Sequence, residues 1–435
     1  MIVRLGGHTL LVSLLAASMV AAVACRRSLR SMMKLAAAPP LRPVILIAGP
    51  TGVGKSEVAM QLALRLGGEI VSVDSVQVYR SLDIGANKPS AAELARVTHH
   101  LLDLREPDEA YTAGDFYRDA SVAIAEIQAR GRTPICVGGT SMYMHWLVAG
   151  TPTAPKADPE LVAAAEARLA PLRSSGDWDT ALALLAANDP ERAAALSRND
   201  WYRLTRALTI ATQTGGTPLA ELERVDGCAH LHEMYDLRPF FLFAPRQQLA
   251  HRIDARCEQM LIDGLLRETY EGLANGRLLP ESQPGRAVGY RQALEYLTRP
   301  DAQERDAAAL TQFVADFAQA SRAYAAQQMK WFRKERAFEW LEVRSPADVE
   351  EVATQIELVC ALSKTDELAR RASVQYAAEQ EAAYRRNLEE GSRMKLYLPA
   401  FPTSSRADVV EQLLAQADGF RKILNLALRS RAADP

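Results

Sequence analysis

Cysteine and net charge are both scarce in this sequence. Only five of the 435 residues are cysteines, and no two of them form a C-x-x-C pair, so neither a zinc finger nor a disulfide framework is indicated. Such cysteine use is typical of a reducing compartment. Lys and Arg total 51 against 53 Asp and Glu. A polyanionic ligand would therefore need a local basic patch, because the whole-chain charge offers no steering.

Acidic residues are missing from the N-terminal segment, where the first one is Glu57. Residues 9–24 are nearly all apolar, and basic residues follow them. This pattern predicts a presequence for a mitochondrion or another organelle. Two alternatives stay open. One is a signal peptide or a membrane anchor, although residues 9–24 are shorter than the about 20 residues of a usual span. The other is initiation at Met32 or Met33, which would give a cytoplasmic protein. We expect membrane contact only if residues 9–24 are retained as an anchor.

Short apolar runs alternate with helical patterns in the first part of the chain. The run VILIA at 44–48 is typical of a buried parallel strand. Further strands are expected at 70–73, 101–104 and 135–137, and a helix at 119–130. This alternation predicts an α/β fold with a doubly wound parallel sheet, whose site lies at the carboxyl ends of the strands.

The amino-acid composition and the expected secondary structure change after position 152. Residues 158–215 are rich in Ala and Leu and are expected to be helical, and the run FFLFA at 240–244 returns the chain to the sheet. Long amphipathic helices are expected around 246–275 and 305–336. Residues 363–395 are polar on most sides, which favours a solvated helix or a partly ordered tail over an extra RNA or partner contact. With a hydrophobic content of 48%, the chain should form two or three domains. We divide it into an N-terminal targeting or anchor segment (1–40), the first part of the core (41–150), an inserted helical domain (151–215), the second part of the core (216–345) and a helical C-terminal extension (346–435).

One motif indicates phosphate binding. Residues 49–56 read GPTGVGKS, a match to the P-loop pattern G-x-x-x-x-G-K-[ST], with a strand before it and a helix after it. Backbone N–H groups of such a loop surround a phosphate, and the helix N-terminus adds partial positive charge. Lys55 would contact the terminal phosphate, and the Ser56 hydroxyl would ligate Mg²⁺, the expected cofactor. The residues expected to hold the phosphates are Gly49, Pro50, Thr51, Gly52, Val53, Gly54, Lys55 and Ser56.

No acid follows the strand at 135–137, where many P-loop NTPases place a carboxylate for Mg²⁺. That strand runs instead into Gly138-Gly139-Thr140. The nearest carboxylate at a strand end is Asp74, after residues 70–73. An acid near there can deprotonate an acceptor, so the core is more typical of a group transferase than of a mechanical ATPase. Asp74 could instead serve the metal.

From Asp74 onward, the chain resembles the tRNA dimethylallyltransferase family, also called tRNA isopentenyltransferase. The resemblance is colinear over about residues 42 to 340, which makes it far more specific than the loop alone. It looks like the bacterial or organellar form, because the C-terminal zinc finger of many eukaryotic relatives is missing. The matching blocks are DSVQVY at 74–79, LDIGANKP at 82–89, HHLLD at 99–103, YTAGDF at 111–116, GGTSMY at 138–143, ND with R and RAL at 199–208, VGYRQ at 288–292 and QMKWFR at 328–333.

The resemblance implies both substrates. The donor would be dimethylallyl diphosphate, held by the loop in place of ATP. The acceptor would be N6 of the adenosine just 3′ of the anticodon in tRNA, whose anticodon stem-loop would bind to the inserted domain 151–215 and to helices of 216–345. We expect a monomer without a stable protein partner.

The same resemblance implies catalytic roles. Charge builds up on the leaving diphosphate, so the loop amides, Lys55 and Mg²⁺ can stabilise the transition state more than the ground state. Thr51 and Thr140 can donate hydrogen bonds to the substrate. Arg256 matches a family arginine that helps to bind diphosphate, although by itself it would be read as a surface ion-pair residue. Asp74 is the candidate general base for the adenine amino group, with a helix N-cap or a metal ligand as its alternatives.

The RNA side of the prediction rests on several blocks. The acceptor base must leave its stack, so base flipping is expected, and single-stranded RNA is read through stacking and base edges. Arginines would bind phosphates, Tyr290 or Trp331 would stack on a base, and Gln77 would read a base edge; by itself, Trp331 would more often be a core residue. The residues that match the family's tRNA-contact blocks are Asp74, Ser75, Val76, Gln77, Thr140, Arg203, Arg206, Arg286, Gly289, Tyr290, Arg291, Gln328, Trp331 and Arg333.

Some positions depart from the family pattern. Ala326 and Gln327 stand where two basic residues are common, which could weaken tRNA binding unless nearby basic residues compensate.

Three other functions stay open: an adenylate isopentenyltransferase that prenylates free AMP, ADP or ATP, a P-loop nucleotide kinase, and an RNA-binding protein with a vestigial loop. The inserted helical domain and the GYRQ block favour tRNA, because a free nucleotide acceptor needs neither.

Overall fold

The computed structural model describes residues 42–433 apart from 152–156, 218–230, 300–305, 395–396, 398 and 400–406. The expected presequence or anchor within 1–40 therefore lies outside the described residues. Among the residues that are described, no helix combines the length and apolar character needed to cross a bilayer.

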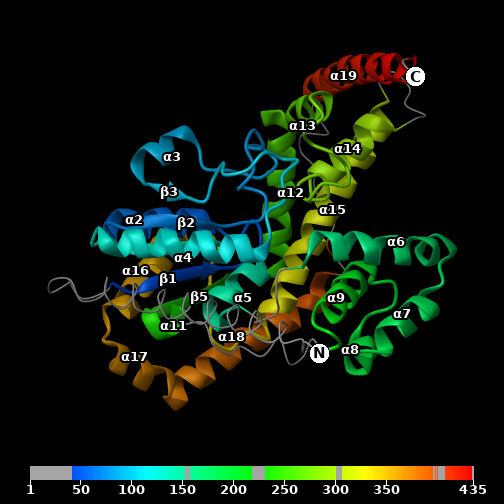
Figure 1. Ribbon diagram of the computed structural model, residues 1–435. Coiled ribbons are helices and arrows are strands. Elements are labelled where there is room, and N and C mark those ends of the chain that lie inside the picture. The colour runs from blue at the N-terminus through cyan, green and yellow to red at the C-terminus, as the bar shows by residue number, and fades with distance from the viewer. Residues whose placement is uncertain are drawn as a thin grey trace, which may run out of the picture. The chain divides into compact units, whose positions relative to one another are not determined.

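One parallel sheet of six strands organises the chain, in the order β3-β2-β4-β1-β5-β6 (Figure 1). β1 lies in the interior of the sheet and all five of its residues are buried, as its apolar run predicts. The predicted α/β fold with a parallel sheet is confirmed. The strands are β1 (Val44–Ala48), β2 (Glu69–Val73), β3 (His99–His100), β4 (Pro134–Gly138), β5 (Leu237–Phe243) and β6 (Glu339–Glu342).

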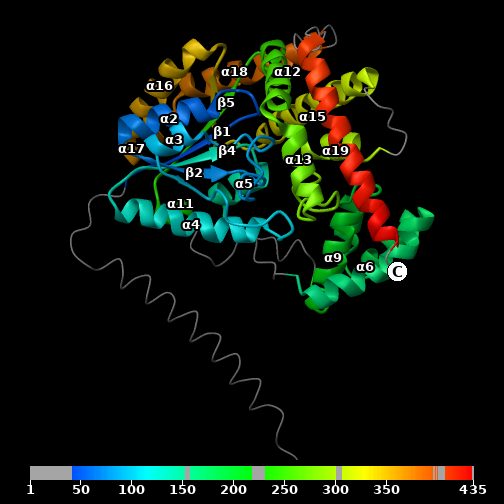
Figure 2. The ribbon, with the colours of Figure 1, turned by 90° about the horizontal axis from the view of Figure 1, so that it is seen from above.

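Helices cover both faces of this sheet. Figure 2 shows α2 (Lys55–Leu66) and α16 (Val349–Ala361) on one side of it, and α4 (Ala113–Ala129) and α5 (Ser141–Ala149) on the other. The helices that complete the part of the chain 42–299 are α3 (Ala91–Arg96), α6 (Pro159–Ser175), α7 (Trp178–Ala186), α8 (Pro190–Ala195), α9 (Trp201–Gln213), α11 (Leu231–Met234), α12 (Arg246–Asp263), α13 (Leu265–Ala274) and α14 (Tyr290–Thr298). After them come α15 (Ala307–Phe332), the 3-10 turn η1 (Pro346–Asp348), α17 (Lys364–Arg371), α18 (Val374–Arg393) and α19 (Ala407–Ala433).

The prediction of a strand at 101–104 is wrong. The strand is instead β3, two residues earlier, because Leu101 (φ 64°) and Asp103 (φ 55°) adopt left-handed backbone conformations that no strand contains. The expected helix at 119–130 begins earlier, at Ala113, because Thr112 and Asp115 form a capping box. The single helix expected at 246–275 is two helices, α12 and α13, which meet at Gly264 (φ 110°).

The helices between residues 159 and 213 have an apolar core of their own. Its members include Leu169, Trp178, Leu185 and Leu204, and the rings of Trp178 and Trp201 meet edge-on at a centroid distance of 5.1 Å. These residues are separate from the main core, which surrounds the sheet. A separate core is what an inserted helical domain requires, while the assignment of 151–215 to tRNA binding stays a prediction.

The C-terminal extension is built into the main core. α16 packs on α2, α18 packs on β6 and α12, and α19 packs on α13 and α14. Most side chains of 364–389 are exposed, as expected for a solvated helix, but Glu367, Ala383 and Asn387 are buried. β6 was not expected from the sequence, and it provides the edge strand to which this extension is attached.

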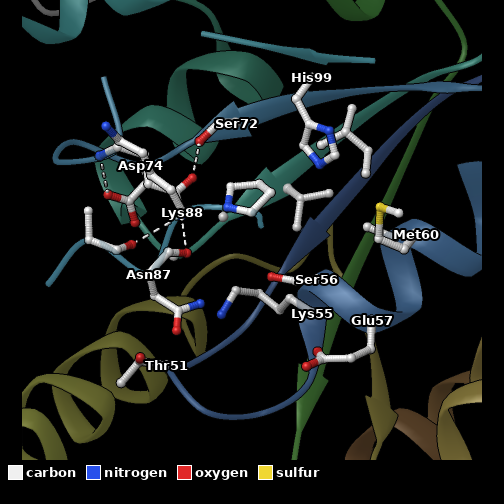
Figure 3. A pocket seen from close by; sticks show the side chains of 18 of the residues that line it. Thr51, Lys55, Ser56, Glu57, Met60, Ser72, Asp74, Asn87, Lys88 and His99 are labelled. Carbon is white, nitrogen blue, oxygen red and sulfur yellow. Dashed lines mark hydrogen bonds between the residues drawn. The ribbon is translucent and has the colours of Figure 1, made fainter. Parts of the chain in front are cut away.

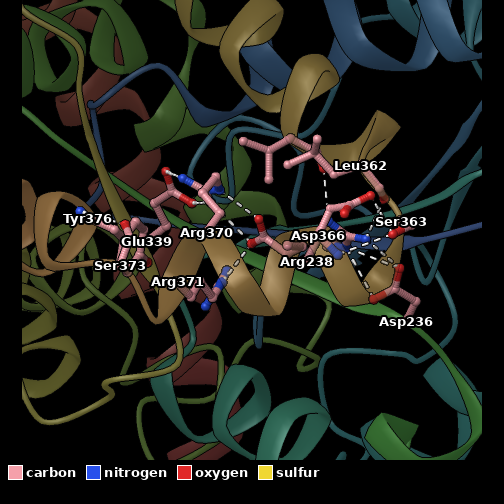
Figure 4. A network of polar contacts seen from close by, with 12 residues as sticks. Asp236, Arg238, Glu339, Leu362, Ser363, Asp366, Arg370, Arg371, Ser373 and Tyr376 are labelled. Atoms are coloured by element: carbon pink, nitrogen blue, oxygen red, sulfur yellow. Dashed lines mark hydrogen bonds and ion pairs between the residues drawn. The ribbon is translucent and has the colours of Figure 1, made fainter.

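A buried arginine joins the sheet to the extension (Figure 4). Arg238 of β5 is 1% exposed and donates to Asp236 and to the carbonyl oxygens of Val359 (2.8 Å) and Leu362 (2.9 Å). These carbonyls end α16, and the last carbonyls of a helix have no partner within it. Arg238 therefore fixes the end of α16 against β5.

Replacing this arginine should destabilise the fold. In Arg238→Met, Asp236 and the Leu362 carbonyl lose the arginine donor, and the Val359 carbonyl keeps only the Leu362 N–H, so we expect the free energy of unfolding to fall by about 3 kcal/mol. Urea denaturation followed by circular dichroism measures this change. The matched control is Arg118→Gln, which removes an exposed pair with Asp115 and should cost less than about 1 kcal/mol. Equal shifts for the two variants would contradict the role of Arg238.

Candidate active site

The phosphate loop connects β1 to α2. Gly54 is the N-cap of α2 in a left-handed conformation (φ 102°) and carries no capping side chain, so the first N–H groups of the helix are free to bind an anion. Close packing also restricts Gly49, where an added Cβ would lie 2.6 Å from the carbonyl oxygen of Leu242. The loop therefore has the backbone geometry that its sequence motif predicts.

A cavity opens beside this loop, at the carboxyl ends of β1, β2 and β4 (Figure 3). Its volume is about 180 Å³, and it is partly open to solvent. The predicted site residues that line it are Thr51, Lys55, Ser56, Asp74, Gln77, Arg256 and Gln328. Segments that lie far apart in the sequence thus meet around one space.

The ammonium group of Lys55 is placed to bind an anion. Its Nζ donates to the carbonyl oxygen of Pro50 at 2.8 Å, and it forms no ion pair among the described residues. Burial and the nearby Arg256 lower the pKa of Lys55 to about 8, against the opposing effects of Asp74 and Glu57. A diphosphate would replace water as the partner of this ammonium group.

Two helices brace the loop at Thr51. Arg256 of α12 donates to Thr51 Oγ1 at 2.8 Å, which leaves the Thr51 hydroxyl proton free for a substrate oxygen. Gln328 of α15 accepts from the Thr51 N–H at 3.0 Å and donates to the Gly139 carbonyl at 2.8 Å. Arg256 thus belongs to the cavity and is not a surface ion-pair residue.

The structure does not support a tRNA contact for Gln328. The side chain is 3% exposed and both ends of its amide are bonded within the protein. An added Cβ at Gly139 would lie 2.2 Å from Gln328 Nε2, so this glycine is needed for the close approach. Gln328 holds the phosphate loop to the end of β4.

Asp74 ends β2 with one carboxylate oxygen available. Its Oδ1 accepts from the N–H groups of Val76 (2.8 Å) and Gln77 (3.3 Å), while its Oδ2 makes no hydrogen bond among the described residues. Thr140 Oγ1 accepts from the Ser75 N–H at 3.1 Å, which leaves the Thr140 hydroxyl proton free to donate. Asp74 therefore combines a turn-forming oxygen with a free oxygen that can take a proton.

Two further residues predicted for the RNA side use their polar groups within the protein, and their roles toward RNA stay predictions. Gln77 was expected to read a base edge, but its amide accepts from Ser72 and donates to the carbonyls of Ala86 and Asn87. Tyr290 was expected to stack on a base, but it is fully buried and donates its phenolic hydrogen to Glu268. Gln77 thus lines the cavity with its amide already bonded within the protein, and Tyr290 is enclosed by protein in this arrangement.

The remaining predicted tRNA residues lie outside the cavity. Arg203 and Arg206 on α9, and Arg286 and Arg291 around the start of α14, are exposed and can reach phosphates. Trp331 is half-buried and meets the ring of His145 edge-on. Ser75 and Val76 use their N–H groups in the turn after β2, Gly289 is buried with φ 98°, and Arg333 donates to Asn387 of α18.

Sequence reasoning missed Tyr324, which also lines the cavity. It lies one helical turn before Gln328 on α15, a spacing of four that places both side chains on one face. Burial and the Asp74 carboxylate raise the pKa of Tyr324, so its phenol stays protonated and can donate. The spacing was the only signal in the sequence.

Known proteins match this chain over much of its length. Residues 77–335 match the family model described as IPP transferase. tRNA dimethylallyltransferase 9 of Arabidopsis thaliana is 42% identical over 336 residues, covering 70% of this chain and 72% of the relative. tRNA dimethylallyltransferase 1 of Citrifermentans bemidjiense is 42% identical over 301 residues, covering 69% and 92%.

Two solved structures are also similar. The tRNA isopentenylpyrophosphate transferase of Bacillus halodurans matches with a TM-score of 0.52 and 30% identity, covering 76% of this chain and 98% of that one. A eukaryotic dimethylallyltransferase described as acting on tRNA matches with a TM-score of 0.59 and 26% identity, covering 73% and 78%. The resemblance stated from the sequence is confirmed: this chain belongs to the IPP transferase family, together with proteins named tRNA dimethylallyltransferase.

Proposed function

We propose that this chain transfers a dimethylallyl group from dimethylallyl diphosphate to tRNA, at N6 of the adenosine 3′ to the anticodon. The observation that carries the proposal is one cavity that joins a phosphate loop with Lys55 to the free carboxylate oxygen of Asp74, in a chain of the IPP transferase family. The names of the relatives support the donor and acceptor classes.

The donor half of the reaction breaks the bond between the allylic C1 and oxygen. The electron pair of that bond leaves with the diphosphate, so negative charge grows on the phosphate oxygens. Loop N–H groups, the Lys55 ammonium and the Thr51 hydroxyl are positioned to stabilise that charge. Arg256 orients the Thr51 hydroxyl and adds a second positive charge nearby.

The acceptor half forms the bond between C1 and N6 of the adenine. Its amino group is a weak nucleophile because the lone pair is delocalised into the ring. Asp74 Oδ2 would take the N6 proton as the new bond forms, which raises electron density on the nitrogen. The Thr140 hydroxyl and the Tyr324 phenol, whose oxygen interacts with Gln328, each keep a proton that can be donated to the flipped base.

Mg²⁺ fits this site only together with the diphosphate. The Ser56 hydroxyl lines the cavity, while no cluster of three His, Cys, Asp or Glu side chains that could hold a metal exists among the described residues. Mg²⁺ at phosphate sites uses one or two protein oxygens, with phosphate oxygens and waters completing the shell. Ser56 would hold the ion, which would neutralise charge on the leaving group.

We propose an organelle as the cellular setting of this chain. The acid-free stretch before Glu57 supports delivery to an organelle, and the alternative start at Met32 or Met33 would leave the protein in the cytoplasm. We further propose a monomer, because one chain supplies both the phosphate loop and the candidate base.

Transfer to different acceptors tests the proposed function directly. The full chain should transfer labelled dimethylallyl to an unmodified anticodon stem-loop far faster than to AMP, because the exposed arginines can bind RNA phosphates. A stem-loop with guanosine in place of the acceptor adenosine is the matched control and should accept nothing. Faster transfer to AMP would reassign the chain as an adenylate isopentenyltransferase. Phosphate transfer from ATP without a prenyl donor would make it a kinase.

The role of Asp74 is tested by Asp74→Asn. Asparagine keeps an oxygen for the Val76 and Gln77 N–H groups but cannot take the N6 proton. We expect kcat to fall by about 10²- to 10⁴-fold, while the Kd for dimethylallyl diphosphate, measured by calorimetry without tRNA, stays within a few-fold. Near wild-type turnover would remove Asp74 as the base.

The lowered pKa of Lys55 predicts a pH dependence of donor binding. Below pH of about 8 the ammonium is charged in the free protein, and above it the amine must gain a proton on binding. The Kd for dimethylallyl diphosphate should therefore rise as pH increases from 7 to 9.5, by up to about tenfold per unit above the pKa. Lys55→Arg keeps its charge throughout and should flatten the curve. An equally steep rise in that variant would assign the pH dependence to another group.

A further inference from the structure

Residues 83–89 form the roof loop of the cavity. Four of them, Ala86, Asn87, Lys88 and Pro89, line the space beside the phosphate loop. Asn87 has a left-handed backbone (φ 50°), and so has Ser81 (φ 60°) just before the roof loop. Residues other than glycine keep this conformation only where surrounding contacts impose it. The contacts that hold the roof loop therefore decide the shape of one wall of the cavity.

A single carboxylate provides three of these contacts. Glu268, in the first turn of α13, accepts hydrogen bonds from three successive N–H groups of the roof loop. Its Oε2 lies 2.6 Å from the N–H nitrogen of Asp83 and 2.8 Å from that of Ile84, and its Oε1 lies 3.0 Å from that of Gly85. Successive N–H groups directed at one point form a nest for an anion, and here the anion is a side chain of the same protein.

Tyr290 contacts both the Glu268 carboxylate and the roof loop. Its phenol donates to Glu268 Oε1 at 2.6 Å, and its ring lies so close to Gly85 that an added Cβ would be 2.5 Å from ring carbon Cζ. Burial and the Glu268 carboxylate hold the pKa of Tyr290 well above its usual range, so the phenol keeps its proton. The roof loop is thus held between a carboxylate and an aromatic ring.

Hydrogen bonds continue from the roof loop to the candidate base. Gln77 Nε2 donates to the carbonyls of Ala86 (3.2 Å) and Asn87 (3.0 Å), and the Gln77 N–H donates to Asp74 Oδ1. Figure 3 shows the side chains of Asn87 and Lys55 directed toward the same part of the cavity. A shift of the roof loop would therefore be transmitted through Gln77 to Asp74.

Tyr290 also connects the roof loop to an exposed basic segment. It begins α14 between Gly289 and Arg291, and the side chains of Arg286 and Arg291 are exposed around it. RNA phosphates bound by these arginines would lie on the outer side of the backbone that carries Tyr290. The inner side of that backbone contacts Glu268 and Gly85.

We propose that Glu268 and Tyr290 form a latch that positions the roof loop for prenyl transfer and links it to the arginine-bearing segment. Both are positioning residues, because they act through residues 83–89 and Gln77. The latch rests on the proposed function for its catalytic consequence, while its physical basis, protection of the roof-loop amides, can be measured without any substrate.

Hydrogen exchange followed by mass spectrometry tests the physical basis. Glu268→Gln offers one acceptor oxygen in place of two and turns an NH₂ group toward the roof-loop N–H groups. We expect peptides that contain residues 83–85 to exchange at least about tenfold faster, because those N–H groups lose their acceptor. Peptides from β2 should be unchanged. The matched control is Glu271→Gln, three residues further along α13, where the side chain pairs with the exposed Arg267 and with no other described residue.

Kinetics test the catalytic consequence. Glu268→Gln should lower kcat for transfer to the stem-loop by at least about tenfold, since small misplacements of reacting groups are costly. Its Kd for inorganic pyrophosphate should stay within twofold, because the phosphate loop is unchanged. Tyr290→Phe keeps the ring on Gly85 and loses only the hydrogen bond to Glu268. Its decrease in kcat should therefore be smaller than that of Glu268→Gln. The double variant should be no slower than Glu268→Gln, since Tyr290 acts through the same carboxylate.

The outcomes separate the latch from the proposed function. Unchanged exchange at 83–85 in Glu268→Gln overturns the latch, whatever the activity. Faster exchange with kcat within twofold of the wild type makes Glu268 a structural residue only and also overturns it. Effects of the two substitutions that multiply in the double variant contradict the link through Tyr290. If the wild type transfers nothing to tRNA, the proposed function fails, and the exchange result still decides the physical basis of the latch.

Discussion

The two hydrogen bonds of Gln328 hold together the parts on which the site depends. They join the Thr51 N–H in the phosphate loop to the Gly139 carbonyl at the end of β4, from a helix that lies 277 residues beyond Thr51 in the sequence. Without this brace, the direct side-chain link between the Thr51 N–H and the Gly139 carbonyl would be lost, and Arg256 alone would join a helix to Thr51 among the described residues. With it, the anion site formed by the loop amides and Lys55 keeps a set position relative to the turn that carries Asp74, and group transfer requires such a relation.

Other contacts, further from Gln328, also fix the positions of the loops around the cavity. Arg256 orients the Thr51 hydroxyl, and Glu268 holds the roof loop by three N–H groups. The C-terminal extension acts further out, where Arg238 fixes the end of α16 and α16 packs on α2, the helix that follows the phosphate loop. The extension thereby contributes to the stability of the loop, although none of the cavity-lining residues belongs to it.

Local signals in the sequence predicted the parts whose conformation is decided locally. The run at 44–48, the loop motif and the acid at the end of β2 each carry a pattern within a few residues, so Lys55 and Asp74 could be found. Contacts between distant segments could not be read in this way. β6 is a short, charged strand that forms because β5 offers it a partner, and Leu101 leaves the expected strand because its backbone turns left-handed. The same limit applies to polar residues whose side chains are bonded within the protein. A glutamine or tyrosine within a family RNA-contact block has the right chemistry for RNA, and only the packed helices show that Gln328 and Tyr290 face inward.

The central claim is that the phosphate loop holds a leaving group and delivers a prenyl group to tRNA. The most direct measurement is mass spectrometry of nucleosides from total tRNA of cells with the gene, without it, and with it restored. The account predicts that N6-dimethylallyl adenosine, or a derivative made from it, is lost from a subset of tRNAs when the gene is absent and returns when the gene is restored. Unchanged tRNA together with a loss of prenylated free adenine nucleotides would contradict it.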